Sequence, residues 1–173
     1  MKVLAFDTAI STGCAFGVAG GTPKTWQVAL GKTSWDARFA RCLRMVESYA
    51  KQFEPDLIVV EAPAAGNFSN ADLVGLSICV RAQAARMGIP VKSYYPNSVR
   101  KYFLGKALTS RDFPGKTKAA AKGAIKAAVI ARCHLLGWDV VGSDAADAAA
   151  LWDYACSQES RAHQLSTVGG LFA

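Results

Sequence analysis

The chain has 173 residues, 51% of them hydrophobic, which is typical of one globular domain with a substantial core. It carries 20 basic and 13 acidic residues, a net charge of +7, and has no apolar run near the roughly 20 residues of a membrane span. The first apolar run starts too early to leave room for a signal peptide. Scattered cysteines without a Cys-x-x-Cys pair indicate reduced thiols in a cytoplasm, not disulfides or zinc.

The first part of the chain predicts three strands and one helix. Residues 2–6 form a buried apolar run, and residues 14–18 form a second one after a predicted turn at Ser11-Thr12-Gly13. Alternating apolar residues predict a third strand over 25–30. Ser34 is a plausible N-cap for a helix that ends before Pro55. The helix itself is predicted from apolar side chains at helical spacing, namely Phe39, Leu43, Val46, Ala50 and Phe53.

The second part alternates strand and helix before it becomes helical. Two apolar runs predict strands over 57–61 and 89–94, with a loop over 66–70 between the first of them and the next helix. Helices are predicted over 71–87, 96–103, 116–136 and 143–157. We expect residues 1–158 to form one domain and residues 159–173 to form a C-terminal tail.

The order of these elements predicts an α/β fold. Three strands in close succession form an antiparallel meander, and the next two strands, each reached through a helix, run parallel. The result is a mixed five-stranded sheet flanked by helices on both faces. In such a sheet the first strand is central and the fourth lies parallel beside it.

Four acidic residues are expected to converge at one edge of this sheet. Asp7 and Glu61 end the first and fourth strands, while Asp144 and Asp147 stand three residues apart at the start of the last helix. Carboxylates beside buried strands are costly unless a cation compensates them. Their oxygens suit Mg²⁺, with Mn²⁺ as the alternative. The alternatives to metal binding are purely structural. Asp7 would organise a turn, and the acids at the helix start would stabilise the helix dipole.

Positive charge is concentrated in one segment. Residues 92–132 contain 10 basic residues and only one acidic residue, Asp112, so the rest of the chain is slightly acidic. Such an excess is typical of a protein that binds a polyanion, although a solvated basic surface without a partner is the alternative. Lys118, Lys122 and Lys126 are spaced to share one side of the long predicted helix.

These motifs together resemble the RuvC Holliday junction resolvases, which belong to the retroviral integrase superfamily of RNase H-like folds. The resemblance covers about residues 2–156 and rests on Asp7 before Ser11-Thr12-Gly13, on Glu61, and on Asp144-Ala145-Ala146-Asp147-Ala148. It implies a metal-dependent endonuclease that resolves four-way DNA junctions by paired symmetric nicks, with two metal ions. All four acids would be catalytic metal ligands, with Asp7 bridging the two ions.

The resemblance also implies a set of DNA contacts. Pro96-Asn97-Ser98-Val99-Arg100 matches a Pro-x-x-Val-basic element and places Arg100 at the DNA, and the predicted lysine helix matches the basic helix of the family. The family's stacking Phe position is Ala64 here, so Phe68 is expected to take that role. The predicted phosphate-binding lysines are Lys116, Lys118, Lys122 and Lys126. Differences in spacing hint at a phage or prophage version, acting in a prokaryotic or phage-infected cell.

A two-fold DNA junction suits a homodimer, and by resemblance the helix over 71–87 is the candidate interface, with Leu76 and Val80 in its apolar stripe. That stripe could instead belong to the core. Two DNA alternatives remain, a junction-binding protein that does not cleave and a less selective nuclease for branched DNA. A kinase-like domain of the actin superfamily would need two related halves. No motif points to a motor-protein partner.

Overall fold

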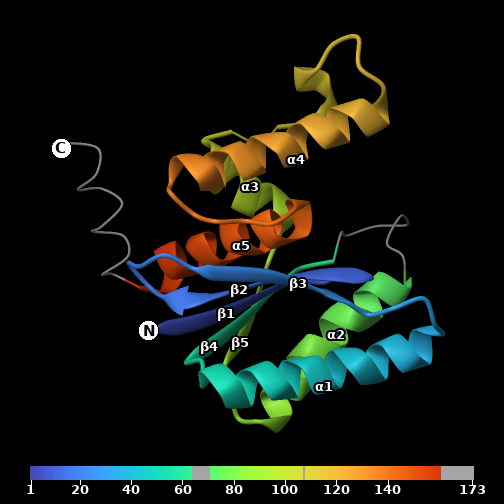
Figure 1. Ribbon diagram of the computed structural model, residues 1–173, viewed down its shortest axis with the longest axis vertical. Coiled ribbons are helices and arrows are strands. Elements are labelled where there is room, and N and C mark those ends of the chain that lie inside the picture. Colours follow the sequence, from blue (N-terminus) through green and yellow to red (C-terminus); the bar gives the residue numbers. More distant parts are fainter. Residues whose placement is uncertain (64–70, 107, 161–173) are drawn as a thin grey trace.

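The structure is a computed structural model, and it describes residues 1–63, 71–106 and 108–160. Its strands are β1 (Lys2–Asp7), β2 (Ser11–Val18), β3 (Lys24–Ala29), β4 (Leu57–Glu61) and β5 (Val91–Tyr94). They form one sheet in the order β3-β2-β1-β4-β5, with an antiparallel meander and two parallel strands (Figure 1). The predicted mixed sheet, with β1 at its centre and β4 parallel beside it, is confirmed.

Strand β2 is longer than the sequence predicted. It begins at Ser11, so the residues expected in a turn belong to the ladder, and Asp7 of β1 pairs with Gly13 of β2. The prediction was wrong because small polar residues favour turns only where the backbone has no other partner. Here the β1 and β3 ladders on either side satisfy the backbone of this segment.

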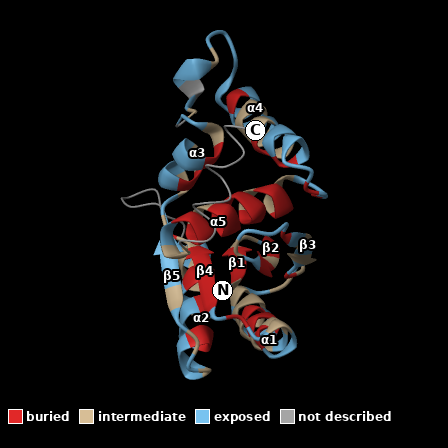
Figure 2. Cartoon of the chain, turned by 90° about the vertical axis from the view of Figure 1, so that its left-hand side faces the viewer, coloured by how far each residue is buried: buried red, intermediate tan, exposed pale blue. Residues whose placement is uncertain are grey.

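Helices cover both faces of the sheet (Figures 1 and 2). Two helices lie on one face, and α5 lies on the other face between the sheet and the remaining helices. The helices are α1 (Trp35–Phe53), α2 (Ala71–Arg86), α3 (Pro96–Leu104), α4 (Lys118–Leu135) and α5 (Ser143–Glu159), with a short 3-10 turn at Ser110–Asp112. The side chain of Ser34 accepts a hydrogen bond from the Ala37 backbone, which confirms the predicted N-cap of α1.

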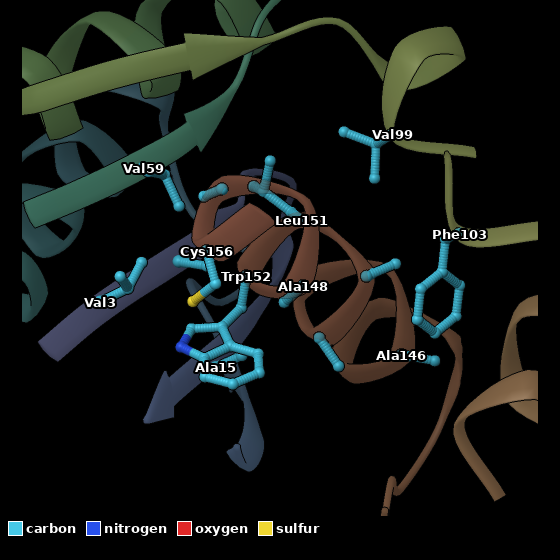
Figure 3. Packing of buried hydrophobic residues seen from close by; sticks show 14 of the residues in the cluster. Val3, Ala15, Val59, Val99, Phe103, Ala146, Ala148, Leu151, Trp152 and Cys156 are labelled. Atoms are coloured by element: carbon cyan, nitrogen blue, oxygen red, sulfur yellow. The ribbon is translucent and has the colours of Figure 1, made fainter. Parts of the chain in front are cut away.

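Alternation along the central strands divides the core into two halves. Val3 and Ala5 of β1 face α5, whereas Leu4 and Phe6 face α1 and α2. The α5 half contains many alanines, so this helix can approach the sheet closely, and Trp152 is fully buried there (Figure 3). A buried helix this close to the strands fixes the position of its first turn relative to the ends of β1 and β4.

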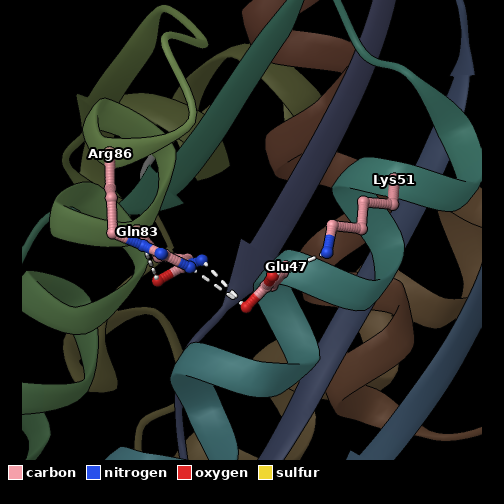
Figure 4. A network of polar contacts seen from close by, with 4 residues as sticks. All are labelled: Glu47, Lys51, Gln83 and Arg86. Atoms are coloured by element: carbon pink, nitrogen blue, oxygen red, sulfur yellow. Dashed lines mark hydrogen bonds and ion pairs between the residues drawn. The ribbon is translucent and has the colours of Figure 1, made fainter.

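A polar contact at the surface links helices α1 and α2. Glu47 of α1 accepts hydrogen bonds from Lys51 at 2.7 Å and from Arg86 of α2 at 3.1 Å (Figure 4). Leu76 and Val80 of α2 are fully buried in the core between α1, α2 and the sheet. The stripe that was predicted as a dimer interface is therefore core, because α2 directs it towards α1 and the sheet.

The last helix extends further than predicted. Helix α5 runs to Glu159, whose carboxylate accepts hydrogen bonds from Lys92 at 2.6 Å and from the Tyr94 hydroxyl at 2.7 Å. These contacts tie the end of α5 to the outer strand β5. The predicted tail lies mostly outside the described residues. In the described part of the chain, no helix is long and apolar enough to cross a membrane.

Candidate active site at the sheet edge

Asp7 and Glu61 meet at adjacent strand ends. Phe6 pairs with Val60 in the parallel ladder, and each of the two acids is the next residue along its strand. Because side chains alternate, Asp7 follows Val3 and Ala5 towards α5, and Glu61 follows Leu57 and Val59 to the same side. Both carboxyl groups therefore face the start of α5.

A glycine brings the start of α5 over this edge. Gly13 pairs with Asp7, and a Cβ atom at Gly13 would overlap the backbone carbonyl of Asp144. Only glycine leaves the space that this approach needs. Asp144 and Asp147, one helical turn apart on α5, are thereby held near the strand-end acids. All four predicted acids are partly buried at one edge of the sheet.

A lysine from α4 reaches the same cluster. The Lys126 Nζ atom donates hydrogen bonds to Asp144 Oδ1 and Ser143 Oγ, both at 2.9 Å, and lies 3.9 Å from Asp147 Oδ2. Its side chain is 32% exposed, against 23% for Asp144 and 11% for Asp147. Lys126 was predicted to contact phosphates, but in the structure its ammonium group binds acidic residues of the cluster.

Burial makes the charged forms of the two strand-end acids unfavourable. Burial and the neighbouring charges of Glu61, Asp147 and Asp144 raise the pKa of Asp7 well above its usual range. Burial also raises the pKa of Glu61, with Arg100 and a hydrogen bond from the Asp7 side chain opposing that rise. The pair therefore lacks full cationic compensation.

The two acids of α5 behave differently from each other. Burial raises the pKa of Asp147, although the positive charges of Arg100, Lys126 and Lys122 oppose the rise. Burial also acts to raise the pKa of Asp144, but its hydrogen bond to Lys126 and the charge of Lys126 lower it overall. Asp144 is thus the acid whose charge the protein itself neutralises, while Asp147 remains short of positive charge.

The donor set suits a divalent cation by its chemistry. In residues 1–63, 71–106 and 108–160, no three His, Cys, Asp or Glu side chains are grouped so that they could hold a metal ion in their present positions. Burial nevertheless raises the pKa of Asp7, Glu61 and Asp147, so a cation beside them would stabilise their ionised forms. Carboxylate oxygens are the ligands that Mg²⁺ and Mn²⁺ prefer.

Further basic side chains lie on α3, on α4 and just before α4. Arg100 of α3 is half-buried and acts on both Glu61 and Asp147, closer to the acids than its predicted role at the DNA surface implied. Lys118 and Lys122 are exposed on α4, and Lys116 lies before this helix with its ammonium group 5.5 Å from the Phe113 ring centroid. Phe68, the predicted stacking residue, lies outside the described residues.

The sequence identified the acids but not the polar groups that bind them. Ser143 and Ser11 contribute hydrogen bonds to Asp144, and Lys126 neutralises it. The only sequence feature that pointed to Lys126 as a partner of the acids is its position one turn after Lys122, which puts two lysines on one side of α4. Which of the two turns inward depends on where α4 crosses α5, and local spacing does not contain that information.

No protein-family model and no curated protein matches the sequence. The structure resembles Thermus thermophilus RuvC, with a TM-score of 0.68, 20% identity, and coverage of 91% of this chain and 95% of that chain. It also resembles T. thermophilus RuvC in complex with Holliday junction substrate, with a TM-score of 0.66, 20% identity, and coverage of 94% and 97%. A third solved structure is the yeast mitochondrial Holliday junction resolvase Ydc2, with a TM-score of 0.56, 13% identity, and coverage of 99% and 84%. The chain therefore has the RNase H-like fold of these resolvases.

Proposed function

We propose that this protein is a structure-selective endodeoxyribonuclease that resolves four-way DNA junctions. The observation that carries the proposal is the convergence of Asp7, Glu61, Asp144 and Asp147 at one sheet edge of a fold shared with Holliday junction resolvases. One of those neighbours was solved in complex with a Holliday junction substrate, which supports a junction as the DNA substrate here. The reaction would take place in the cytoplasm of a prokaryotic or phage-infected cell.

The chemistry is hydrolysis of a phosphodiester. The oxygen of a water molecule bonds to phosphorus, the phosphorus–oxygen bond to one nucleotide breaks, and the leaving oxygen takes a proton. Divalent ions, Mg²⁺ or Mn²⁺, would acidify the water and stabilise the leaving oxygen, and two of them are expected from the sequence. Asp7, Glu61 and Asp147 are the residues that would hold such an ion, because burial raises the pKa of each and a cation there would stabilise their ionised forms.

The basic residues would bind and orient the DNA backbone. Lys118 and Lys122 are exposed on α4, the helix that also carries Lys126, and Lys116 precedes them. Lysines placed this way neutralise phosphates whatever the base sequence, so selectivity would come from the shape of the junction. Arg100 lies near enough to act on Asp147 and Glu61, so it would stabilise a phosphate held at the acidic cluster.

Paired nicks require two active sites, and a two-fold homodimer supplies them on a two-fold junction. Helix α2 remains the proposed dimer interface, but the contact would be made by the side of α2 that faces away from α1 and the sheet. Ile78 is 54% exposed there, and Val74, Ala82 and Ala85 lie on the same side at helical spacing. A row of apolar side chains along the outer side of a helix is a surface that can pack against a second copy.

The test is cleavage of an end-labelled four-way junction in Mg²⁺. We expect the native chain to make symmetric paired nicks, and Asp147→Asn to bind the junction without nicking it. Asp139→Asn is the control, because Asp139 is exposed and stands outside the cluster. Equal nicking by native chain and Asp147→Asn would refute the site. Binding without nicking by the native chain would favour a junction-binding protein, and equal cleavage of forks and flaps a less selective nuclease.

A further inference from the structure

The connection between α3 and α4 carries basic side chains that lie away from the acidic cluster. Residues 108–117, which we call the α3–α4 segment, contain the exposed residues Arg111 and Lys116, and Asp112 is the one acid among them. Figures 1 and 2 show that this segment forms the end of the molecule farthest from α1 and α2, with α4 and α5 between it and the sheet. It is therefore a surface separate from the edge where the four acids meet.

Polar contacts within the α3–α4 segment hold it in a defined turn. The Asp112 Oδ2 atom accepts hydrogen bonds from the Thr109 backbone at 2.7 Å and from the Thr109 hydroxyl at 3.0 Å. The Thr109 hydroxyl in turn accepts a hydrogen bond from the Arg111 backbone at 3.3 Å. A threonine and an acid three residues later that bind each other in this way order the first turn of a helix, here the 3-10 turn at Ser110–Asp112. The turn therefore sets the position of Arg111.

The acid in this turn is compensated, whereas the positive groups beside it are not. Asp112 Oδ1 lies 3.8 Å from the Lys106 ammonium group, so the negative charge of the turn is balanced. The Arg111 guanidinium group makes no ion pair with the described residues. The Lys116 ammonium group lies 5.5 Å from the Phe113 ring centroid, a cation–π contact that leaves its charge in place. The segment thus presents two uncompensated positive charges at the surface.

The distance of the segment from the acids decides which part of a DNA molecule it can reach. Helix α4 packs against both the 3-10 turn and α5, which carries Asp144 and Asp147, and lies between them (Figure 1). An α-helix with its side chains is about 10–12 Å wide. Phosphates of one DNA strand follow each other at about 3.4 Å along the axis. A phosphate beside Arg111 would consequently stand at least about three nucleotides from one held at the acidic cluster.

We propose that the α3–α4 segment binds the phosphate backbone of a duplex arm of the DNA junction, through Arg111 and Lys116. This inference rests on the nuclease function proposed above and adds a DNA contact away from the phosphate that is cleaved. A turn that is already ordered loses little conformational freedom on binding. Because the contact is to phosphates, it would add affinity on any base sequence and fix the direction in which the arm leaves the active site.

The first test measures binding of a fluorescent four-way junction by anisotropy, without divalent ions so that no strand is cut. Arg111→Gln should weaken binding several-fold at low salt and reduce the slope of log affinity against log salt by about 1. Arg44→Gln is the matched control, because Arg44 is an exposed arginine of α1 on the opposite face of the sheet. It should bind as the native chain does. Equal affinities and slopes for the two variants would overturn the inference.

The second test locates the contact on the DNA. Phosphates of one arm are replaced one at a time by uncharged methylphosphonates, from the crossover outwards. The affinity of the native chain should fall at a position about three or more nucleotides along the arm, and the affinity of Arg111→Gln should not fall there. Equal losses for the native chain and Arg111→Gln at every position would overturn the inference, because Arg111 would then act elsewhere.

Asp112→Ala separates the shape of the turn from the charge of the region. Removal of this acid makes the segment more positive, so charge alone would tighten DNA binding. Loss of its hydrogen bonds to Thr109 releases the turn that positions Arg111, so we expect weaker binding instead. Unchanged or tighter binding by Asp112→Ala would overturn the inference that a fixed turn presents Arg111 to the DNA.

The two proposals can fail separately. If the native chain cleaves junctions and Arg111→Gln binds them equally well, the nuclease stands and the arm contact is removed. If binding depends on Arg111 and on arm phosphates but no strand is cut in Mg²⁺, the arm contact stands and the nuclease is removed. A native chain that binds no junction at low salt would overturn both.

Discussion

Gly13 of β2 lies directly against the backbone carbonyl of Asp144, and the same glycine pairs with Asp7 in the β1–β2 ladder. One residue thus sets the distance between an acid of the sheet and the acids of α5. The contact is between backbones, so its geometry does not depend on a flexible side chain. The acidic cluster is consequently held by the core and not by a loop.

Replacing Gly13 with alanine should therefore separate the two groups of acids. The added Cβ atom would overlap the Asp144 carbonyl, and α5 must shift to accommodate it. A displacement of about 1 Å can cost about 100-fold in rate, so we expect at least that loss of junction cleavage. The strain should also lower the free energy of unfolding by about 1–3 kcal/mol.

Gly123→Ala is the stability control for this prediction, measured in the same denaturant titration. Gly123 is an exposed residue of α4, and a Cβ there would meet no neighbouring atom. Alanine is the better helix former by about 1 kcal/mol, so this variant should be as stable as the native chain or more so. Gly13→Ala would contradict the prediction if it matched the native chain in both rate and stability.

The elevated pKa of Asp7 predicts how the stability of the metal-free protein changes with pH. A carboxyl group whose pKa is higher in the folded than in the unfolded chain favours folding while protonated. Its contribution is complete below the ordinary value of 3.8 and is lost as the pH rises through the raised value. Asp7→Asn removes this titration, so it should raise the free energy of unfolding of the metal-free protein at neutral pH.

Thermal unfolding across a pH series, with and without Mg²⁺, measures this effect. The melting temperatures of the native chain and Asp7→Asn should converge at low pH and diverge towards neutral pH. Mg²⁺ should raise the native melting temperature more than that of the variant, because it binds the ionised cluster. Asp139→Asn, at an exposed acid outside the cluster, should follow the native chain. Parallel curves for native chain and Asp7→Asn at every pH would contradict the prediction.

The outer side of α2 predicts how a charge would affect the oligomer. Ile78→Asp should convert a dimer into a monomer in sedimentation experiments, since it places a charge in the proposed interface. Paired nicks should then become single, uncoupled nicks. Leu135→Asp is the control, because Leu135 is 80% exposed at the end of α4, on the other face of the sheet.

Substitutions at Leu76 or Val80 would not answer this question. Both side chains are fully buried in the protomer, so a charge there would unfold the chain whether or not it dimerises. An unchanged mass for Ile78→Asp, with a folded protein by circular dichroism, would show that α2 is not the interface.

The exposed lysines of α4 predict a salt-dependent affinity for DNA. Lys122→Gln should weaken junction binding at low salt by several-fold and reduce the slope of log affinity against log salt by about 1. Lys51→Gln is the control, because this lysine is 67% exposed on α1, on the opposite face of the sheet. The variants are compared by fluorescence anisotropy from low to moderate salt. Equal slopes for the two variants would remove Lys122 from the DNA contacts.

The sequence was sufficient for the fold because the relevant signals are local. Alternating and helical spacing of apolar residues predicted each strand and each α-helix, with the helix ends within two residues of those observed. The order of elements then allowed few sheet arrangements. The strand-end positions of Asp7 and Glu61 followed from the same reasoning, because parallel neighbours end at the same edge. The start of β2 was missed because its turn-favouring residues pair with β1 and β3.

What only the tertiary structure decided are the contacts made where helices cross. Lys122 and Lys126 look alike along the chain, yet the packing of α4 on α5 turns Lys126 to Asp144 and leaves Lys122 exposed. Leu76 and Ile78 are both apolar residues of α2, yet the first is core and the second is surface. Spacing along a helix shows which residues share a side, but the direction of that side depends on long-range packing. The sequence by itself thus determined the acids and the sheet that presents them, and the tertiary structure decided which cation accompanies them.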